Sequence, residues 1–190
     1  EKFDYLFLGN IIDRDFSNPD MLILLLALKL KYPDHIYLLL GEGELRHVSQ
    51  KISLFDKRDV NTFERFSETL KETFNYLPVA ATIDNRIFCS HGVPRGGIKL
   101  SDLEFLERPL HPERLALVGE IILSQFNERE DSLSEKKSKF VGKAKIKEFL
   151  MENRLEIIIR GKEGALRKGC AQDMNGALLT LVSGFYNSPS

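Results

Sequence analysis

Short apolar runs that end at glycine and polar residues are the main pattern of this chain. The run from Tyr37 to Leu40 stops at Gly41, and two carboxylates, Glu42 and Glu44, follow with one glycine between them. A continuous apolar run of this length, closed by glycine and charge, predicts a strand buried on both faces. In an α/β protein the polar end of such a strand is where the chemistry is placed. We therefore expect this turn to organise the functional site.

The segment around this run predicts a strand-helix-strand unit. It begins with a strand from Tyr5 to Leu8, continues as a helix from Met21 to Lys31 and returns as a strand from Ile36 to Leu40. Asn18 as the helix cap and Pro19 at the first helical position support this helix start. Because such a crossover makes the two strands parallel, their carboxyl ends lie at one edge of the sheet.

The residues after these two strands are therefore expected to meet. Asn10, Asp13 and Arg14 follow the first strand, and we expect them to lie near Glu42 and Glu44.

The rest of the chain predicts alternating helices and strands without an internal repeat. A helical spacing runs from Arg46 to Tyr76, and Asn61 to Glu64 has the pattern of a capping box. Asp84 and Asn85 separate two apolar runs and predict a hairpin. The apolar positions expected in the core of this helical region are Phe63, Phe66, Leu70 and Phe74. Other expected elements are helices at 101–104, 113–123 and 140–150 and strands at 79–83, 86–90, 155–159 and 178–182.

Five predicted strands end at polar turns that contain glycine. The residues at these turns are Asn10, Glu42, His91, Lys162 and Ser183. Such a pattern predicts one crevice lined by separate segments of a single domain. The polar run 127–139 is expected to be a solvated loop within that domain.

Composition narrows the class of protein without naming a ligand. The 190 residues carry 27 Lys and Arg against 28 Asp and Glu, a net charge of -1, so no basic surplus suggests nucleic acid. The apolar segment Met21 to Leu28 is far shorter than the roughly 20 residues that span a bilayer. Cys89 and Cys170 are too few for a disulfide framework and are expected to be reduced. We expect an intracellular, cytoplasmic protein, and the composition names no partner.

Several motifs, in order, carry a resemblance to a known family. Tyr5 to Arg14 resembles the YLFLGDYVDRG signature of the metal-dependent serine/threonine phosphoprotein phosphatases, the family of protein phosphatase 1, 2A and calcineurin. Leu25 to Leu39 resembles the stretch before the family's RGNHE motif, and Phe74 to Ala81 its FxxLPLAA helix exit. Ile87 to Gly92 is similar to its CxHGG strand end, and Ile157 to Gly161 to its IIRGH.

This resemblance implies an α/β fold of the calcineurin-like metallophosphoesterase type, with a central β-sandwich of mixed sheets flanked by helices and with βαβ units. Residues 1–190 would form a single phosphatase-like domain that lacks the family's first strand, with its GDxHG motif, and its C-terminal end. In the family, two divalent metals such as Mn, Fe or Zn activate a water or hydroxide that attacks the phosphate.

The positions that the resemblance assigns to metal binding have changed here. The bridging Asp is replaced by Asn10, the metal-binding Asn by Glu42 and the last His by Lys162, so only His91 is kept. An ammonium about 4 Å from a divalent ion costs roughly 8 kcal/mol at an effective dielectric near 20. Gly43 replaces the histidine that donates a proton to the leaving group. We therefore expect no bound metal and no catalytic residue.

Phosphate recognition is only partly retained. Arg14 matches a phosphate-binding arginine of the family, and Asp13 matches the Asp that orients the missing histidine. Asp15 replaces the glycine that follows. The family's second phosphate arginine would fall near Glu135 or Lys136, where no arginine occurs. Arg14 is thus either a remnant that packs against Asp15 or a residual anion site.

Each site residue also has a simpler structural interpretation. His91 is expected to be a core histidine with both ring nitrogens satisfied by backbone. Glu42 and Glu44 would be solvated turn residues, or Glu44 would hold the helix that starts at Leu45. Alternatively, a carboxylate pairs with Lys162 where the family binds metal; the candidates are Glu42, Asp13 and Asp15. We favour such an ion pair because it neutralises carboxylates gathered at one edge.

The predicted function is that of a pseudophosphatase, a phosphatase-like domain that acts as a protein-binding or scaffold module without catalysis. A phosphatase with altered metal use is one alternative, with a single metal held by Glu42, His91 and upstream ligands. A phosphopeptide-binding domain anchored by Arg14 is another. Association with the cytoskeleton is compatible with the first interpretation.

Overall fold

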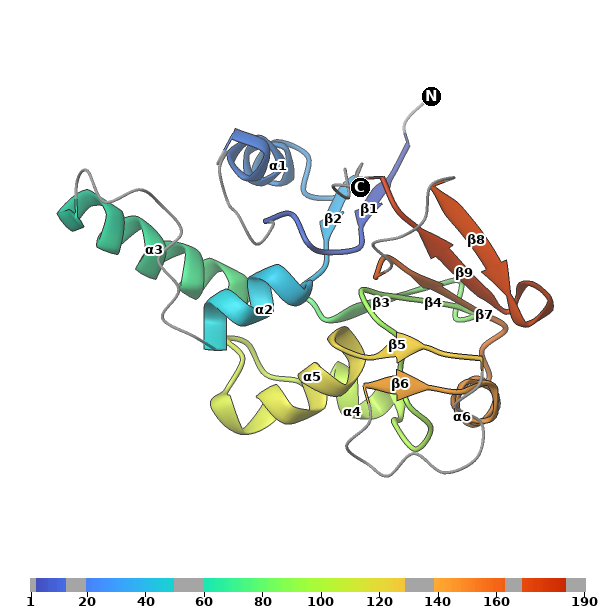
Figure 1. The fold of residues 1–190 in the computed structure, drawn as a ribbon. Helices are drawn as coiled ribbons and strands as arrows, with labels where there is room; N and C mark the ends of the chain where they lie inside the picture. Colours follow the sequence, from blue (N-terminus) through green and yellow to red (C-terminus); the bar gives the residue numbers. More distant parts are fainter. Residues whose placement is uncertain (1–2, 13–19, 50–59, 129–138, 163–168, 184–190) are drawn as a thin grey trace, which may run out of the picture.

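A computed structural model describes residues 3–12, 20–49, 60–128, 139–162 and 169–183 of the chain. A five-stranded mixed sheet lies at its centre, in the order β3-β4-β7-β9-β8. Its strands are β3 (Ala80–Ile83), β4 (Ile87–Ser90), β7 (Ile157–Arg160), β8 (Cys170–Asp173) and β9 (Leu178–Leu181). β4, β7 and β9 are parallel to one another, so their carboxyl ends lie at one edge (Figure 1). The predicted α/β class is confirmed.

A smaller unit precedes this sheet and confirms the predicted strand-helix-strand arrangement. β1 (Tyr5–Phe7) pairs in parallel with β2 (Ile36–Leu38), and α1 (Asp20–Lys31) connects them. α1 buries Leu22 and Leu25, the latter in a small apolar cluster with Ile36 and Leu38. The predicted helix start at Asn18 and Pro19 lies outside the described residues.

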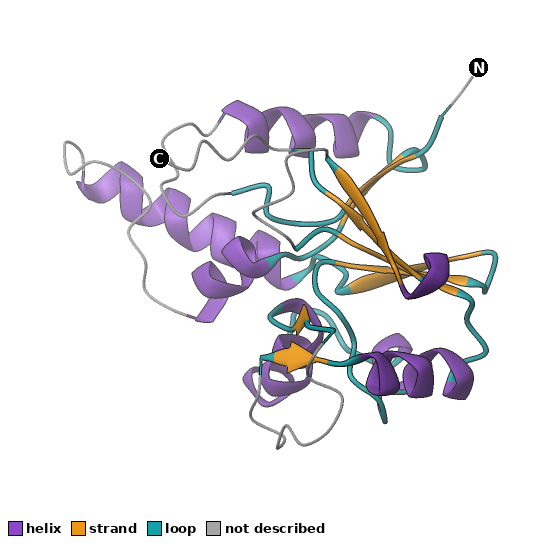
Figure 2. Ribbon diagram, turned by 45° about the vertical axis from the view of Figure 1, so that its right-hand side comes forward, coloured by secondary structure: helices purple, strands orange, loops and turns teal. Residues whose placement is uncertain are grey.

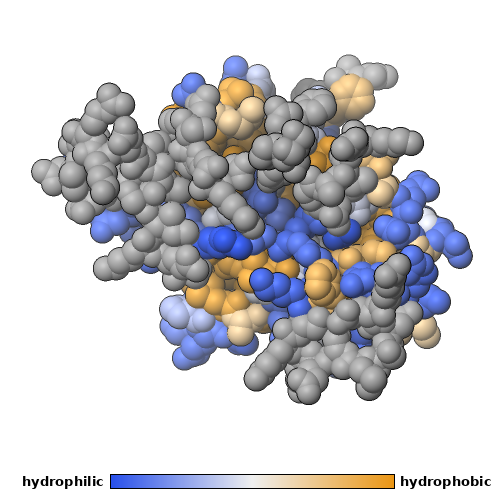
Figure 3. Space-filling view, viewed as in Figure 1, coloured by the Kyte–Doolittle hydropathy of each residue, from blue (hydrophilic) through white to orange (hydrophobic). Residues whose placement is uncertain are grey.

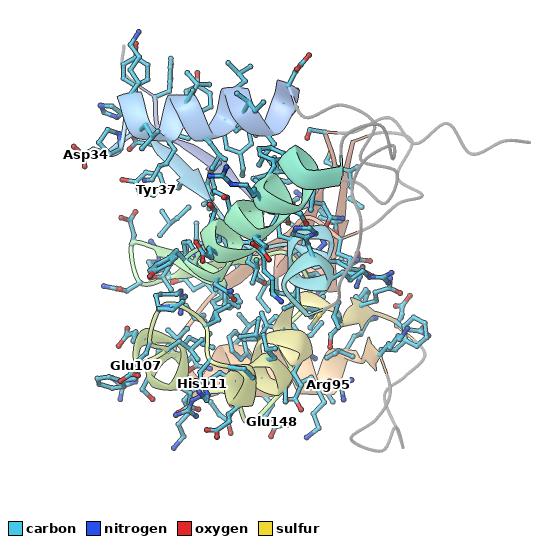
Figure 4. The ribbon with its side chains drawn as sticks, turned by 90° about the vertical axis from the view of Figure 1, so that its left-hand side faces the viewer. Asp34, Tyr37, Arg95, Glu107, His111 and Glu148 are labelled. Atoms are coloured by element: carbon cyan, nitrogen blue, oxygen red, sulfur yellow. The ribbon has the colours of Figure 1, made fainter. Side chains whose placement is uncertain are left out.

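β2 is buried on one face only, which corrects the prediction that both faces are buried. Ile36 and Leu38 are buried, whereas the side chain between them, Tyr37, is 43% exposed. Tyr37 lies at the margin of the molecule close to Asp34, whose carbonyl accepts its hydroxyl hydrogen bond at 2.9 Å (Figure 4). β2 therefore follows the period-2 alternation of a half-buried strand.

The remaining helices surround the main sheet. They are α2 (Glu42–Ser49), α3 (Val60–Asn75), α4 (Leu100–Glu104), α5 (Leu115–Ile122) and α6 (Lys143–Glu152). α4, α5 and α6 lie on the opposite side of the sheet from α1 (Figures 1 and 2). The rings of Phe88 on β4 and Phe149 on α6 meet edge to face at 5.0 Å between centroids, and both side chains are fully buried. Leu70 and Phe74 of α3 are buried as predicted.

The hairpin predicted at Asp84 and Asn85 is present between β3 and β4. Both residues have positive φ, 51° and 53°, the conformation that the central residues of a type I′ turn require.

Several element boundaries differ from the prediction. α3 already begins at Val60, so Asn61 is inside the helix and is not its cap. α4 is capped at Lys99, whose backbone N–H donates to the Asp102 carboxylate at 3.2 Å. A 3-10 turn, Pro112–Arg114, precedes α5.

Short strands account for the other differences. The predicted helix at 140–150 begins at Lys143, because Phe140–Val141 forms a strand, β6, beside β5 (Gln125–Phe126). β8 was not predicted, and most of the polar run 127–139 lies outside the described residues.

Two surface properties bear on function. Hydrophilic side chains occupy the middle of the face shown in Figure 3, between apolar areas. Within the described ranges, none of the helices combines the length and the hydropathy needed to cross a membrane.

Candidate functional site

The backbone segments that follow β1 and β2 pass very close to each other. A Cβ added to Gly41 would lie 2.1 Å from the backbone nitrogen of Asn10, so the contact requires glycine. Asn10 itself has a positive φ of 55°, which asparagine tolerates better than most residues. Its side-chain oxygen accepts a hydrogen bond from the backbone N–H of Gly43 at 2.9 Å. The predicted proximity of Asn10 to the turn after β2 is confirmed.

Glu44 ties these two turns together. Its side chain is fully buried, and one carboxylate oxygen accepts the backbone N–H groups of Asn10 at 2.9 Å and Gly41 at 2.8 Å. The other oxygen accepts the N–H of Ile12 at 2.8 Å. Burial raises the pKa of Glu44, and these three hydrogen bonds oppose that effect. The interpretation of Glu44 as a solvated turn residue is therefore wrong.

The alternative role for Glu44, holding the start of the following helix, is closer to the structure. That helix begins at Glu42 and not at Leu45, and Glu42 and Glu44 both lie in its first turn. Negative charge in a first turn is favoured by the helix dipole.

Glu42 lies between two cations. One carboxylate oxygen is 2.8 Å from the ammonium nitrogen of Lys162, and the other accepts a hydrogen bond from Arg46 one helical turn away. Burial acts to raise the pKa of Glu42, but Lys162 and Arg46 together hold it below its usual value. The Glu42 side chain is 16% exposed and that of Lys162 11%, so the pair is largely removed from water. Glu42 is therefore not a solvated turn residue, and the predicted ion pair with Lys162 is confirmed for this carboxylate.

Lys162 connects the end of β7 with two other segments. Its ammonium donates to the carbonyl oxygen of Leu123, at the end of α5, at 2.8 Å. Its backbone N–H donates to the carbonyl oxygen of His91, after β4, at 2.8 Å. Burial lowers the pKa of Lys162, and the charge of Glu42 opposes that shift.

His91 is buried with only one of its ring nitrogens hydrogen bonded. Nδ1 lies 2.8 Å from the carbonyl oxygen of Leu8, and because a carbonyl can only accept, Nδ1 carries the proton. Nε2 is therefore an unprotonated acceptor, and no donor reaches it within the described part of the chain. The prediction that backbone satisfies both nitrogens is wrong for Nε2. Burial lowers the pKa of His91 to about 4.

The described residues do not fit a pair of divalent cations. Within the described ranges, no three His, Cys, Asp or Glu side chains are grouped so that they could hold a metal ion. The Asn10 side-chain oxygen already accepts the Gly43 N–H, and the Glu42 carboxylate is neutralised by Lys162 and Arg46. Of the four family ligand positions, all of which are described, Asn10, Glu42 and Lys162 are engaged in these contacts, and the Nε2 lone pair of His91 is left as a donor of the kind that metals use.

Not all of the predicted site residues can be assigned to this cluster. Those outside the described residues are Asp13, Arg14, Asp15, Glu135 and Lys136, so the proposed phosphate remnant stays a prediction. Ser183, the last of the five predicted strand ends, is exposed. An ion pair and a backbone hydrogen bond connect Glu42, Lys162 and His91. Asn10 is hydrogen bonded to Gly43 and Glu44, in the same turn as Glu42.

Three partners in this cluster were not predicted: the Arg46 side chain and two backbone carbonyl groups. The spacing of Glu42 and Arg46, four positions apart on a helix, was a usable signal for their ion pair. The carbonyl oxygens of Leu8 and Leu123 carry no signal, because every residue has a carbonyl and only the fold brings these two to His91 and Lys162.

Parallel strands that end around this cluster indicate a particular class of protein. Residues 1–161 match the family described as calcineurin-like phosphoesterase, and the chain belongs to that family. It is 28% identical to the serine/threonine-protein phosphatase 4 catalytic subunit of Kluyveromyces lactis and 30% identical to that of Saccharomyces cerevisiae, in each case over 96% of this chain. The chain spans 60% of the length of each of these relatives.

A solved structure supports the same fold. It is a protein serine/threonine phosphatase from Saccharomyces cerevisiae with similarity to human phosphatase PP5, and it superimposes with a TM-score of 0.78. The match covers 95% of this chain and 57% of that chain at 24% identity. The predicted calcineurin-like metallophosphoesterase fold is confirmed, and the relatives to which the chain is similar are serine/threonine phosphatases.

Proposed function

We propose that this chain is a catalytically inactive member of the serine/threonine phosphatases that serves as a protein-binding or scaffold module. The observation that carries the proposal is the 2.8 Å ion pair between Glu42 and Lys162. Both residues stand at positions where the resemblance places metal ligands. A carboxylate held by an ammonium and a guanidinium has little negative charge left to attract a divalent cation.

The position of the proton donor supports the same proposal. Gly43 has no side chain to protonate a leaving alkoxide, and its N–H is engaged by Asn10. A Cβ at this position would lie 2.3 Å from the carbonyl oxygen of Ile12, so the local backbone is adapted to glycine. The backbone around position 43 therefore leaves no room for a proton-donating side chain, so the difference from the family involves the backbone as well as the side chain.

A turnover assay tests the loss of catalysis. The purified chain is incubated with p-nitrophenyl phosphate, with and without added Mn²⁺, beside the His91→Ala variant. We expect phosphate release at the level of the buffer blank for both proteins. Robust Mn²⁺-dependent release that His91→Ala abolishes would overturn the proposal, because it would locate a working reaction at this site.

One observation favours a second candidate, a phosphatase that uses a single metal. The Nε2 atom of His91 is buried and has no hydrogen-bond partner among the described residues. A metal ligand has the same free nitrogen before its metal binds. Elemental analysis after dialysis against Zn²⁺ or Mn²⁺ separates the candidates. One metal per chain in the wild type and none in His91→Gln would favour the single-metal enzyme. No metal in either protein supports the inactive module.

The binding role has its own test. An array presents each peptide in a phosphorylated and in an unmodified form. A scaffold of the kind proposed binds its peptides whether or not they carry phosphate. Binding that requires phosphate and is lost in Arg14→Ala would instead favour a phosphopeptide-binding domain.

A further inference from the structure

We propose that the ammonium of Lys162 acts as an internal cation that joins three chain segments around the ends of β2, β4 and β7, so that the folded state needs no divalent metal there. The inference concerns stability and does not rest on the protein-binding role. It follows from the disagreement between the cations expected for this family and the side chains found at these strand ends.

The first argument is the geometry around Lys162 Nζ. A lysine ammonium has three N–H donors. One is directed to Glu42 Oε2 at 2.8 Å and another to the carbonyl oxygen of Leu123 at 2.8 Å. A carboxylate and a backbone carbonyl are oxygen ligands of the kind that also hold hard divalent cations. The ammonium thus satisfies oxygen atoms that a metal ion could otherwise engage.

The second argument is the set of segments that meet here. Glu42 begins α2, Leu123 follows α5, and Lys162 follows β7, so these two contacts join elements that are far apart in the sequence. The backbone N–H of Lys162 also donates to the carbonyl oxygen of His91, which adds the end of β4. One residue therefore fixes the relative positions of four elements, as a shared metal ion would.

The third argument is charge and burial. The side chains of Lys162 and Glu42 are 11% and 16% exposed, and Arg46 contacts the second oxygen of Glu42. Removing one partner of such a pair leaves a charge in a position that water reaches poorly, and the cost is much larger than for an exposed pair. Lys145 and Glu148 on α6 are a useful comparison, because they lie 2.6 Å apart with side chains 61% and 40% exposed.

The first experiment measures thermal unfolding of the wild-type chain in EDTA and in increasing Mn²⁺ or Zn²⁺. A native-state site filled to about 100 times its Kd would raise Tm by roughly 5 to 10 °C. We expect a change of less than about 1 °C. A rise of the larger size that disappears in His91→Gln would overturn the proposal, whereas a rise that persists in that variant reports binding elsewhere and leaves the strand ends around Lys162 free of metal, as proposed.

The second experiment is a double-mutant cycle on the pair. Lys162→Met keeps most of the apolar stem, and we expect it to lower Tm by roughly 5 to 10 °C. Glu42→Gln in that background should lower Tm by much less than it does in the wild type, since its partner is already gone. The matched cycle of Lys145→Met and Glu148→Gln should give shifts of about 2 °C or less.

Additive effects of Lys162→Met and Glu42→Gln, or a Lys162→Met shift no larger than that of Lys145→Met, would overturn the proposal. The metal titration uses the wild-type chain, so it decides the question even when Lys162→Met does not fold. Failure here is also distinct from failure of the proposed function. A chain with metal-independent stability that nevertheless turns over substrate overturns the inactive module and leaves the role of Lys162 intact.

Discussion

The backbone N–H of Asn10 donates a 2.9 Å hydrogen bond to the buried carboxylate of Glu44, 34 positions later in the sequence. This contact joins the turns after β1 and β2, and two further N–H groups, from Ile12 and Gly41, point at the same carboxylate. The turn after β2 is thus held by a buried carboxylate whose hydrogen bonds go to the backbone.

Replacing Glu44 should therefore destabilise the folded protein itself, whether or not a ligand is bound. In Glu44→Gln an amide NH₂ would face at least one of the three N–H donors, leaving a buried donor without a partner. We expect a loss of about 2 to 4 kcal/mol in the free energy of unfolding, measured by urea denaturation. Glu148→Gln, on the surface of α6, is the matched control and should change it by less than about 0.5 kcal/mol. Equal effects of the two substitutions would contradict this role of Glu44.

Restoring a side chain at position 43 should cost stability and should not restore chemistry. A Cβ there would lie 2.3 Å from the carbonyl oxygen of Ile12, which is backbone and cannot rotate away. We expect Gly43→Ala to destabilise by about 2 kcal/mol or more. We expect Gly43→His to be at least as unstable and to show no turnover of p-nitrophenyl phosphate.

Gly119 in α5 provides the control for this prediction. Its added Cβ would meet only a leucine methyl at 3.7 Å, an ordinary contact. Gly119→Ala should therefore be neutral or stabilise by up to about 1 kcal/mol, because alanine favours a helix. A Gly43→Ala variant as stable as Gly119→Ala would show that the backbone near Ile12 can shift to accommodate the added Cβ, and would contradict this prediction.

Much of this arrangement could be predicted because it depends on regular patterns. The apolar runs at Tyr5 and Ile36 with a helix between them dictate two parallel strands, and parallel strands bring Asn10 and Glu42 to one edge. The proximity of Asn10 to the turn after β2 needed only periodicity and topology. The ion pair with Lys162 needed in addition the opposite charges at positions where the resemblance places metal ligands, and Glu42 was one of three candidate carboxylates.

The parts that could not be predicted depend on packing between distant segments. Capping residues are a local signal, and Asn61 had the right pattern although it is the second residue of a helix that begins at Val60. The carbonyl of Leu123 reaches Lys162 only because α5 ends beside β7. Tyr37 was expected to be buried because an apolar run cannot show whether a second layer covers the outer face.

The turn between β3 and β4 offers a local test of these rules. Asn85 has a φ of 53°, and glycine adopts this region without the steric cost of a Cβ. We expect Asn85→Gly to raise the free energy of unfolding by about 0.5 to 1 kcal/mol and Asn85→Val to lower it by about 1 kcal/mol or more. The measurement is urea denaturation, and a stabilising Asn85→Val would contradict the turn assignment.

The stability of the protein should also depend on pH through His91. Burial lowers the pKa of this histidine from 6.5 to about 4, so between these values the unfolded chain binds a proton that the folded chain does not. Stability is then fully present above about pH 6.5 and falls as the pH is lowered toward 4, by roughly 3 kcal/mol in total. Urea denaturation at pH 7, 6, 5 and 4 measures this loss.

The difference between wild type and His91→Gln isolates this contribution from that of the carboxylates. Glu42, whose pKa is also lowered, loses stability in the same direction as the pH falls, and it does so in both proteins. We expect His91→Gln to be less pH dependent than the wild type by roughly 3 kcal/mol over this range, and a variant of the exposed His111, His111→Gln, to follow the wild type. Parallel pH profiles for wild type and His91→Gln would mean that the imidazole accepts its proton in the folded state as readily as in the unfolded chain. The buried, unpartnered Nε2 would then have an acceptor or a path to water in solution, and burial would not keep His91 neutral in the folded chain.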